Sequence, residues 1–340
     1  MAESLLRVRD LRTYFYTEGG VAKAVDGVGF EISAGETIGL VGESGCGKSV
    51  TALSLLRLIR PPGRIEPGSD IQFDGLDITS LDERSMRAVR GVRMAMVFQE
   101  PMTALNPVFT VGEHIAEVVR VHHAGSKREA WDRAVEMLET VGIPSPRQRA
   151  AEYPHQLSGG MRQRVVIAMA LVMNPALVIA DEPTTALDVT IQAQILELLR
   201  DLQQRFHTSI LLITHDLGVV AETASRVIVM YGGEVVEEAR VNDLFSSAHH
   251  PYTEGLLNAM PKMGRLRKRL ATIPGSVPPP TAWPKGCRFH DRCSYAWDRC
   301  ATEHPPLYEI GGSHVSRCHL AEDPARRAGV HEPVVRSTIA

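Results

Sequence analysis

The stretch Gly42-Glu43-Ser44-Gly45-Cys46-Gly47-Lys48-Ser49 decides the fold of this 340-residue chain. It fits the pattern G-x-x-x-x-G-K-[ST], in which successive backbone N–H groups wrap around a phosphate. In this pattern Lys48 reaches the β- and γ-phosphates of a nucleotide, and Ser49 reaches Mg²⁺. Glycine is needed here because a Cβ atom would block the ligand. The stretch therefore predicts a site for nucleotide phosphates and Mg²⁺.

The flanking residues indicate that a strand leads into this stretch and that a helix follows it. Residues 36–41 contain the apolar run Thr-Ile-Gly-Leu-Val, which is typical of a short strand, and apolar residues follow Lys48 at helical spacing. A bound phosphate would thus lie at a helix N-terminus, where the helix dipole favours anions. Because the motif alone is only moderately specific, the other segments have to support it.

A second segment ends in two adjacent carboxylates. Residues 177–180 are apolar, as in a buried parallel strand, and Asp181 and Glu182 follow directly. Ligands of such sheets lie beyond the carboxyl ends of the strands, so we expect both carboxylates near the phosphates. Asp181 is placed to support Mg²⁺, and Glu182 to orient or deprotonate the attacking water. In the alternative interpretation the two residues only cap the next helix.

A third segment, Leu157-Ser158-Gly159-Gly160-Met161-Arg162-Gln163, indicates a second helix end that suits phosphate. Apolar residues up to Leu171 predict a helix that begins after Ser158, whose hydroxyl and following glycine N–H groups are free for a ligand. The segment resembles the signature sequence of ABC-type ATPases. In that family this helix end faces the γ-phosphate held by the opposite subunit, so the resemblance implies that the site is completed in a dimer. Without the other motifs, Ser158 would be an ordinary N-cap.

The resemblance extends over about the first 240 residues and includes the remaining family elements in order. Gln99 matches the glutamine loop, Ala186-Leu187-Asp188 matches the D-loop, and His215 matches the switch histidine. The resemblance implies that Gln99 and His215 sense the γ-phosphate. A lone histidine at a strand end is usually structural, and here its place after the acidic segment favours the switch role.

Upstream, residues 11–17 alternate as a strand would, and Phe15 matches the aromatic residue that stacks on adenine in the family. Tyr14 and Tyr16 are immediate rivals for this role, and a place in the core is the alternative for Phe15. The residues that the resemblance assigns to ATP and Mg²⁺ are Phe15, Gly42, Ser44, Gly45, Cys46, Gly47, Lys48, Ser49, Val50, Gln99 and Asp181. Those assigned to catalysis are Glu182, His215 and Gln99, with Ser158, Gly159, Gly160 and Gln163 acting on the opposite subunit's nucleotide and Asp188 in the D-loop.

Changes of pattern along the chain predict an α/β fold, and the resemblance implies that residues 1–245 form a P-loop nucleotide-binding domain of the ABC type. This domain begins with an antiparallel β edge, and residues 101–173 form a helical subdomain that carries the signature. Residues 176–238 return to alternating strands and helices. Beyond residue 245 proline becomes frequent, which predicts a small cysteine-containing extension over residues 246–322 and a tail over residues 323–340.

Two segments resemble oligopeptide and dipeptide importer ATPases more narrowly. His249-His250-Pro251-Tyr252-Thr253 through Leu257, with Pro274-Gly275-Ser276-Val277-Pro278 further on, is similar to their C-terminal extension. The segment from Gln99 to Pro107 is similar to their glutamine-loop region, where nucleotide state is communicated to the membrane subunits. A proline-bounded loop that leaves the γ-phosphate site suits a lever, and a simple surface loop is the alternative.

Four of the five cysteines lie in the predicted extension, as Cys287, Cys293, Cys300 and Cys318. Because the cytosol keeps thiols reduced, a metal site is favoured over disulfides. Four thiolates suit Zn²⁺ or an iron–sulfur cluster equally well, and the spacing C-x5-C-x6-C-x17-C decides for neither; free thiols are the third alternative. The resemblance implies a [4Fe–4S] cluster, because peptide-importer ATPases with this cysteine pattern are associated with one. In the phosphate loop, Cys46 is expected to serve only as a small side chain.

Composition agrees with a subunit that faces the cytoplasm. The net charge of −3 gives no reason to expect nucleic acid as a partner. Glu3, Arg7 and Asp10 interrupt the N-terminal apolar residues, so no secretory signal is expected. The longest apolar stretch, Val165 to Met173, is too short for a membrane span, so any membrane role would come through partner chains. The basic run is interpreted as a solvated face, with anionic lipid or a negatively charged cluster as the alternative contact; its residues are Lys262, Arg265, Arg267, Lys268 and Arg269.

The resemblance implies an ATPase that drives the import of peptides or a similar small solute. Its expected partners are a second ABC ATPase subunit, identical or different, two transmembrane permease subunits and an extracytoplasmic solute-binding protein. Its expected place is the cytoplasmic side of the cell membrane. One alternative is the same machinery with nickel or glutathione as cargo. Another is a soluble ABC ATPase that acts on nucleic acid or ribosomes, although such proteins generally carry two cassettes or large insertions. A P-loop kinase is disfavoured by the signature and by His215.

Overall fold

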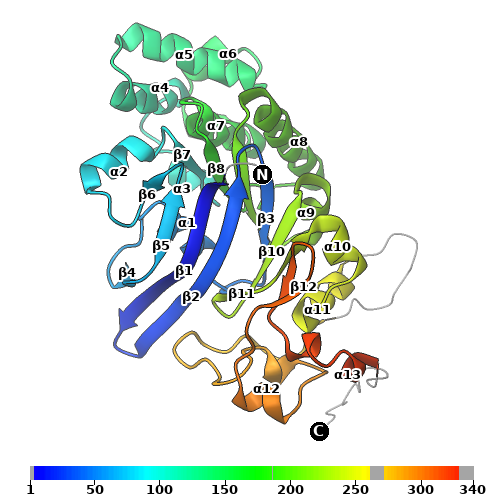
Figure 1. Ribbon diagram of the computed structural model, residues 1–340. Helices are drawn as coiled ribbons and strands as arrows, with labels where there is room; N and C mark the ends of the chain where they lie inside the picture. Colours follow the sequence, from blue (N-terminus) through cyan, green and yellow to red (C-terminus); the bar gives the residue numbers. More distant parts are fainter. Residues whose placement is uncertain (1–3, 186, 261–271, 329–340) are drawn as a thin grey trace.

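The structure is a computed structural model that describes residues 4–185, 187–260 and 272–328. Its strands form two β-sheets (Figure 1). The larger sheet consists, in spatial order, of β12 (Tyr308–Gly311), β13 (His314–Ser316), β11 (Glu234–Arg240), β10 (Arg226–Tyr231), β3 (Thr37–Val41), β9 (Ser209–Thr214), β8 (Leu177–Asp181) and β7 (Met94–Val97). The smaller, antiparallel sheet consists of β2 (Gly20–Ser33), β1 (Ser4–Thr17), β5 (Asp70–Phe73) and β6 (Leu76–Asp77), with β4 (Gly63–Ile65) paired to β1.

Helices cover the larger sheet and form both ends of the molecule in Figure 1. The first half of the chain contains α1 (Lys48–Leu55), α2 (Glu83–Val89), α3 (Pro101–Ala104), α4 (Val111–His122), α5 (Lys127–Thr140), α6 (Pro146–Ala150) and α7 (Gly159–Leu171). The second half contains α8 (Val189–Phe206), α9 (Leu217–Thr223), α10 (Val241–Ser246), α11 (Pro251–Ala259), α12 (Asp298–Thr302) and α13 (Ala325–Ala328).

The centre of the larger sheet is parallel. β10, β3, β9, β8 and β7 pair in parallel, and nearly all residues of these strands are buried. Such strands have both faces covered, so they read as short continuous runs of Val, Ile and Leu, as observed. The predicted α/β fold is thereby confirmed, and the antiparallel edge expected near the start of the chain is the smaller sheet.

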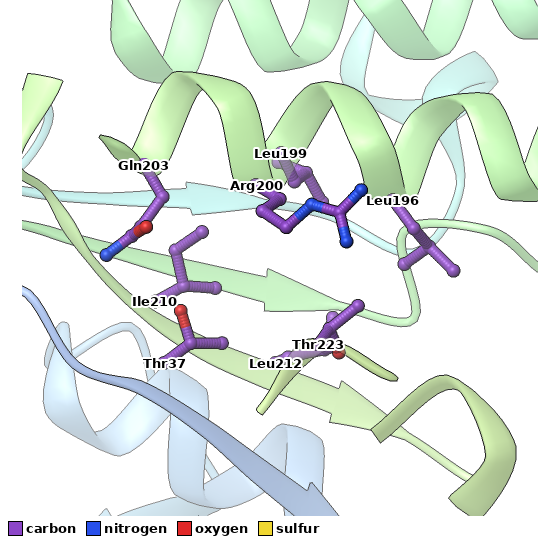
Figure 2. Close-up of a pocket in the computed structure, with 8 residues that line it drawn as sticks. All are labelled: Thr37, Leu196, Leu199, Arg200, Gln203, Ile210, Leu212 and Thr223. Carbon is purple, nitrogen blue, oxygen red and sulfur yellow. The ribbon is translucent and has the colours of Figure 1, made fainter. Parts of the chain in front are cut away.

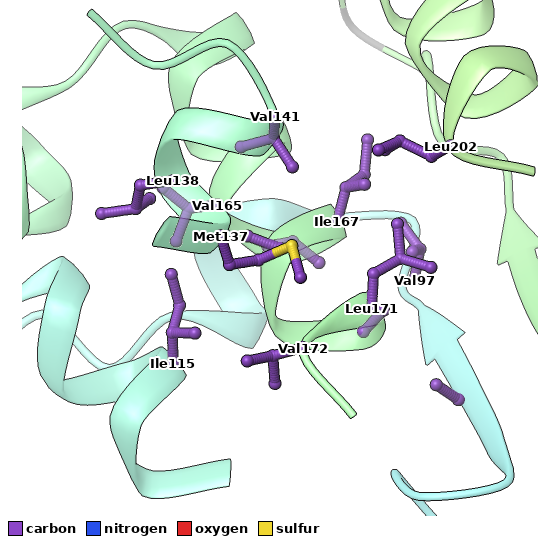
Figure 3. Packing of buried hydrophobic residues seen from close by; sticks show 14 of the residues in the cluster. Val97, Ile115, Met137, Leu138, Val141, Val165, Ile167, Leu171, Val172 and Leu202 are labelled. Carbon is purple, nitrogen blue, oxygen red and sulfur yellow. The ribbon is translucent and has the colours of Figure 1, made fainter. Parts of the chain in front are cut away.

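The helical subdomain expected over residues 101–173 packs as one core with the sheet. Ser126 caps α5, because its hydroxyl accepts the N–H of Glu129 and the Glu129 carboxylate accepts the N–H of Ser126. Side chains of α4, α5 and α7, among them Ile115, Leu138 and Val165, interdigitate beside β7 and α8 (Figure 3). This packing fixes the helix that follows the signature segment against the sheet that carries the other motifs.

One expected loop contains a helix. The segment Gln99–Pro107 was predicted as a proline-bounded loop, but Pro101–Ala104 form the short helix α3. Proline is favoured in the first turn of a helix, because its missing N–H would have no partner there and its fixed φ suits the helix. The sequence interpretation made the proline at position 101 the boundary of a loop. In the structure it is the first residue of a helical turn.

A small cavity of about 50 Å³ lies between α8 and β9 (Figure 2). Its walls include Leu196 and Leu199 from the helix and Ile210 and Leu212 from the strand. None of the site residues predicted from the sequence borders it, so we interpret it as imperfect packing between a helix and a sheet.

The C-terminal extension continues the larger sheet. β13 pairs with β11, and β12 pairs with β13, both in antiparallel fashion. Buried acidic residues of β11 contact the added segment: Nε2 of His314 in β13 lies 2.7 Å from Oε1 of Glu237, and Nε2 of His304, before β12, lies 2.9 Å from Oε2 of Glu234. The segment with many prolines is thus built onto the edge of the sheet.

Ionisation at this junction is shaped by burial. Burial alone would raise the pKa of Glu237, but hydrogen bonds from His314 and the His249 backbone outweigh it and lower that pKa. His250 is buried and its Nδ1 accepts the N–H of Tyr252, and burial lowers its pKa to about 4. At neutral pH the junction thus combines a charged Glu237 with an uncharged His250.

Two predicted features lie outside the described residues. The basic run from Lys262 to Arg269 falls between residues 260 and 272, and most of the tail over residues 323–340 follows residue 328.

Candidate active site

The phosphate-loop stretch connects β3 to α1, as predicted. Gly42, Gly45 and Gly47 have φ angles of 153°, 81° and 106°, which favour glycine. A Cβ atom on Gly42 would lie 2.3 Å from the Met230 carbonyl oxygen, whereas one on Gly45 would meet nothing within 4 Å. Gly42 is therefore required by the protein's own backbone rather than by a ligand. Gly45 keeps the open side of the loop clear.

Lys48 lies at the centre of the loop. Its Nζ donates hydrogen bonds to the carbonyl oxygens of Gly42, at 2.8 Å, and Glu43, at 3.1 Å, and the residue is only 6% exposed. Ser44 and Ser49 are exposed on the loop and at the start of α1, and Val50 is half-buried behind them. Cys46 is buried in the core, where burial raises the pKa of its thiol, so only its backbone is available to a phosphate.

Asp181 ends β8 and carries an unpaired buried oxygen. The residue is 4% exposed, and its Oδ1 has no hydrogen-bond partner. Burial raises the pKa of this carboxyl group, against the opposing effects of the Ser49 hydroxyl and the Lys48 ammonium group. A buried carboxylate oxygen without a partner is unfavourable unless a cation satisfies it, and Mg²⁺ prefers such oxygen ligands. Asp181 and Ser49 therefore fit the predicted Mg²⁺ site.

The other two predicted catalytic residues, Gln99 and His215, both contact the carboxylate of Glu182. Nε2 of Gln99 donates to Oε2 of Glu182 at 3.0 Å, and Nδ1 of His215 lies 3.5 Å from Oε1. Glu182 has a φ of 47°, an uncommon backbone conformation for a residue with a side chain, and such conformations concentrate at functional sites. The structure thus brings Gln99, Glu182 and His215 together.

Thr185 is a member of this cluster that the sequence interpretation missed. Its Oγ1 donates to Oε2 of Glu182 at 2.8 Å. The sequence feature that could have identified Thr185 is its position three residues after Glu182, because a tight turn there brings the chain back to the carboxylate. The N–H of Thr185 also donates to the Glu182 carbonyl oxygen at 3.2 Å.

Strand order explains why residues so far apart in sequence meet here. β3, β9, β8 and β7 are consecutive neighbours, and they run parallel. The phosphate loop, His215, the Asp181–Glu182 pair and Gln99 come at or just after the carboxyl ends of these four strands. All four features therefore lie along one edge of the sheet, where α/β proteins bind their ligands.

The signature segment begins α7, as predicted. Ser158 is exposed, and its Oγ accepts the N–H of Met161 at 3.3 Å, so it does act as an N-cap. A Cβ atom on Gly160 would lie 2.8 Å from Cγ2 of Ile191, so glycine allows α7 to approach α8 closely. Within the described residues, no hydrogen bond joins positions 158–160 to positions 42–49 of the same chain.

Two further residues, assigned with the signature and the D-loop, differ in their surroundings: Gln163 is buried, and Asp188 caps a helix. Gln163 is 1% exposed, so its side chain faces the interior of the subdomain, and its Nε2 has no hydrogen-bond partner. The Asp188 carboxylate caps α8 by accepting the N–H of Ile191 at 3.0 Å. Ala186 of the D-loop lies outside the described residues.

The three aromatic residues considered for adenine all contact the protein. A Cβ atom on Gly63 would lie 2.5 Å from the Phe15 ring, so this half-buried ring packs against β4. The Tyr14 hydroxyl donates to Asp26, and the Tyr16 hydroxyl donates to Glu66 at 2.9 Å. Phe15 alone among them has no polar group, and its stacking role stays a prediction.

The four cysteines of the extension line one small cavity of about 10 Å³. All four are free thiols, and burial raises the pKa of Cys287 to about 12 and that of Cys318 to about 11, with Cys293 raised as well. However, no group of three or more His, Cys, Asp or Glu side chains among the described residues is arranged to hold a metal ion. The predicted [4Fe–4S] or Zn²⁺ site is therefore not formed with the side chains in these positions.

In the described ranges, none of the helices combines the length and the apolar character needed to cross a membrane.

Comparison with known proteins gives a family for both parts of the chain. Residues 25–185 match the ABC transporter family, and residues 236–300 match the oligopeptide/dipeptide transporter C-terminal region. The oligopeptide transport ATP-binding protein AppD of Bacillus subtilis (strain 168) is 55% identical over 321 residues, which cover 94% of this chain and 98% of AppD. The dipeptide transport ATP-binding protein DppD of Escherichia coli (strain K12) is 48% identical over 324 residues, which cover 95% and 99%.

Solved structures agree with these matches. The ATP-binding cassette MJ0796, solved as a dimer in a post-hydrolysis state with ADP and Pi, has a TM-score of 0.62 and 28% identity, and covers 69% of this chain and 98% of that one. The structure of cbiO1 from Clostridium perfringens, part of the ABC transporter complex cbiONQ, has a TM-score of 0.62 and 27% identity, with coverage of 72% and 92%. Because relatives of this similarity span nearly the whole chain, the chain belongs to the ABC transporter family of ATPases, and its C-terminal region is of the oligopeptide/dipeptide transporter type.

Proposed function

We propose that this ATPase drives the import of dipeptides or oligopeptides from the cytoplasmic side of the cell membrane. The observation that carries the proposal is the match of residues 236–300 to the C-terminal region of oligopeptide/dipeptide transporters. The cassette alone would not suffice, because one fold serves many functions. AppD and DppD, whose names state oligopeptide and dipeptide transport, resemble this chain over 94% and 95% of its length.

The site geometry supports a division of labour in hydrolysis. Lys48 and the loop N–H groups bind the phosphates, and Asp181 with Ser49 holds Mg²⁺, which neutralises phosphate charge in the transition state. Glu182 orients or deprotonates the attacking water. Gln99 and His215, which contact the Glu182 carboxylate, respond to the γ-phosphate.

The signature segment serves the nucleotide of a second ATPase subunit. Its exposed Ser158 and the N-terminus of α7 are free for a phosphate, and no hydrogen bond ties them to the loop of the same chain within the described residues. Both the phosphate loop and the signature segment are complete in this chain. The chain therefore supplies the phosphate loop to one ATP site of the dimer and the signature segment to the other, whether its partner is identical or different.

Two exposed apolar residues mark a surface for the membrane partners. Val108 is 70% exposed and Phe109 is 50% exposed, and they follow Gln99 by nine and ten residues. Apolar side chains exposed together suit an interface with other proteins. We assign this surface to the two permease subunits, which would receive solute from an extracytoplasmic binding protein. No nucleic acid is expected as a partner.

Purification of the tagged, full-length chain from membranes in mild detergent tests the importer proposal. We expect two permease subunits and a second ATPase to co-purify, and peptides to be bound to the associated solute-binding protein. Nickel or glutathione on that binding protein would change the cargo and keep the importer. Recovery with ribosomes or DNA, and without permeases, would overturn the proposal.

We also propose that Cys287, Cys293, Cys300 and Cys318 hold a metal centre, with a [4Fe–4S] cluster as the first candidate and Zn²⁺ as the alternative. Four soft thiol ligands around one cavity support this. A bound metal would supply the positive charge that the buried thiols need to lose their protons. The cavity of about 10 Å³ has room for about one water-sized atom, so a cluster would require the four side chains to separate.

Metal analysis of anaerobically purified protein distinguishes these outcomes. We expect about four iron and four sulfide per chain, and loss of both in a Cys293→Ser variant. Stoichiometric zinc without iron or sulfide would replace the cluster with the zinc alternative. Absence of any stoichiometric metal would leave the residues as structural thiols.

A further inference from the structure

A side chain of the extension lies against the phosphate loop. Nη1 of Arg292 donates to Oε2 of Glu43 at 2.6 Å, and Nη2 donates to Oε1 at 3.0 Å. Glu43 is the second residue of the phosphate-loop stretch, 249 residues earlier in the chain. A two-pronged contact of this kind fixes both distance and orientation of the carboxylate. The extension therefore contacts the ATP site directly.

Arg292 is held in a defined position. Its Nε donates to the carbonyl oxygen of Pro274 at 2.9 Å, and its guanidinium lies 5.7 Å from the ring centre of Tyr231 and 5.9 Å from that of Phe289. The side chain is only 5% exposed. Because hydrogen bonds and aromatic rings fix its planar head, Arg292 acts as a rigid support for Glu43.

The backbone of the loop is held from the same side. The N–H of Glu43 donates to the hydroxyl oxygen of Tyr252 at 2.7 Å, and Tyr252 is fully buried in α11. The Tyr252 ring lies 4.7 Å from that of Tyr231, one of the rings beneath Arg292. Main chain and side chain of Glu43 thus both contact one buried aromatic cluster of the extension and β10.

The charge of Glu43 gives this arrangement a consequence for ATP. A carboxylate in a phosphate-binding loop repels a polyanionic ligand, and charges a few ångströms apart near a protein surface interact strongly enough to change affinity about tenfold. Pairing with Arg292 neutralises this carboxylate and holds it toward the extension. Without Arg292, the 29%-exposed carboxylate would be unpaired beside the bound phosphates.

We propose that Arg292 is a positioning residue for ATP binding, which acts by holding the Glu43 carboxylate away from the nucleotide phosphates. The extension thus sets the ATP affinity of the cassette in the same chain. This inference rests on the ATP-binding role of the phosphate loop, and it depends neither on the cargo nor on a metal at the cysteines.

A set of variants of the full-length chain tests this. MgATP affinity is measured by nucleotide titration, and KM and kcat are measured by phosphate release. We expect Arg292→Met to raise both Kd and KM about tenfold and to leave kcat within about twofold. Adding Glu43→Gln to Arg292→Met should recover most of the lost affinity, because the unpaired charge is then gone. Arg292→Lys, which keeps the charge without the two-pronged contact, should lose less than Arg292→Met.

Arg299→Met is the matched control. Arg299 forms ion pairs with Glu303 and Glu322 in the same extension and has no ion pair or hydrogen bond to the phosphate loop among the described residues, so its loss should leave Kd unchanged. Unchanged affinity in Arg292→Met, or a double variant no tighter than Arg292→Met, would overturn the proposal. If Arg292→Met does not fold, as shown by thermal unfolding, Arg292→Gln is compared with its Glu43→Gln double in the same way. Failure of the wild-type chain to bind MgATP would instead refute the ATP site itself.

Discussion

Glu182→Gln should lower the rate of ATP hydrolysis at least a hundredfold while MgATP binding is retained. Glutamine has the size and shape of glutamate but cannot accept a proton from water, and a general base contributes about a hundred- to ten-thousandfold to a rate. The backbone at position 182 keeps its φ of 47° at similar cost, because the two side chains branch alike. The amide oxygen still accepts a hydrogen bond from Gln99 or Thr185, so the edge of the site keeps its shape.

Phosphate release at saturating MgATP measures the rate, and nucleotide titration measures binding. Glu222→Gln, a change of the same chemistry at an exposed position of α9, is the matched control and should leave both unchanged. Undiminished hydrolysis in Glu182→Gln would remove Glu182 from its assigned role. A loss of binding equal to the loss of rate would show that Glu182 serves the ground state rather than the chemical step.

Local patterns were enough to predict the strands and motifs of the ATP site. The runs at residues 37–41, 177–181 and 209–214 are short, apolar and followed by polar residues, as buried parallel strands are. Their order in the sheet is not local information, because β9 lies between β3 and β8 although it follows both in sequence. The resemblance to ABC-type ATPases supplied what periodicity could not, namely that Gln99, Glu182 and His215 share one site.

The extension shows where sequence interpretation fails. Its strands Tyr308–Gly311 and His314–Ser316 are short and partly polar, so no alternation distinguishes them from loops. β13 pairs with β11 beside the buried contact of His314 with Glu237, two residues that look like ordinary surface residues in a linear sequence. The contact of Arg292 with Glu43 could not be predicted either, because nothing local connects residues 249 positions apart. The cysteine spacing singled out the extension, and the metal-binding role of its four cysteines stays a prediction.

Lys48→Ala should weaken MgATP binding roughly ten- to hundredfold. A hydrogen bond to a charged group contributes about 1.5–3 kcal/mol, and each 1.4 kcal/mol is a factor of ten in Kd. Lys48 is the cation at the centre of the loop, with its Nζ on the carbonyl oxygens of Gly42 and Glu43, so its loss also removes the donor that ties those carbonyls together. Both effects act before any chemical step, so the change must appear in binding itself.

This outcome separates Lys48 from Glu182. Equilibrium titration with MgATP should show a raised Kd for Lys48→Ala and a nearly unchanged Kd for Glu182→Gln, although both variants hydrolyse ATP slowly at low nucleotide concentration. Lys127→Ala, at the exposed first residue of α5, removes the same charge elsewhere and should bind ATP as the wild type does. Wild-type affinity in Lys48→Ala would mean that the loop N–H groups alone hold the phosphates. A thermal unfolding midpoint close to that of the wild type ensures that the loss of affinity reflects the missing ammonium group and not a collapsed loop.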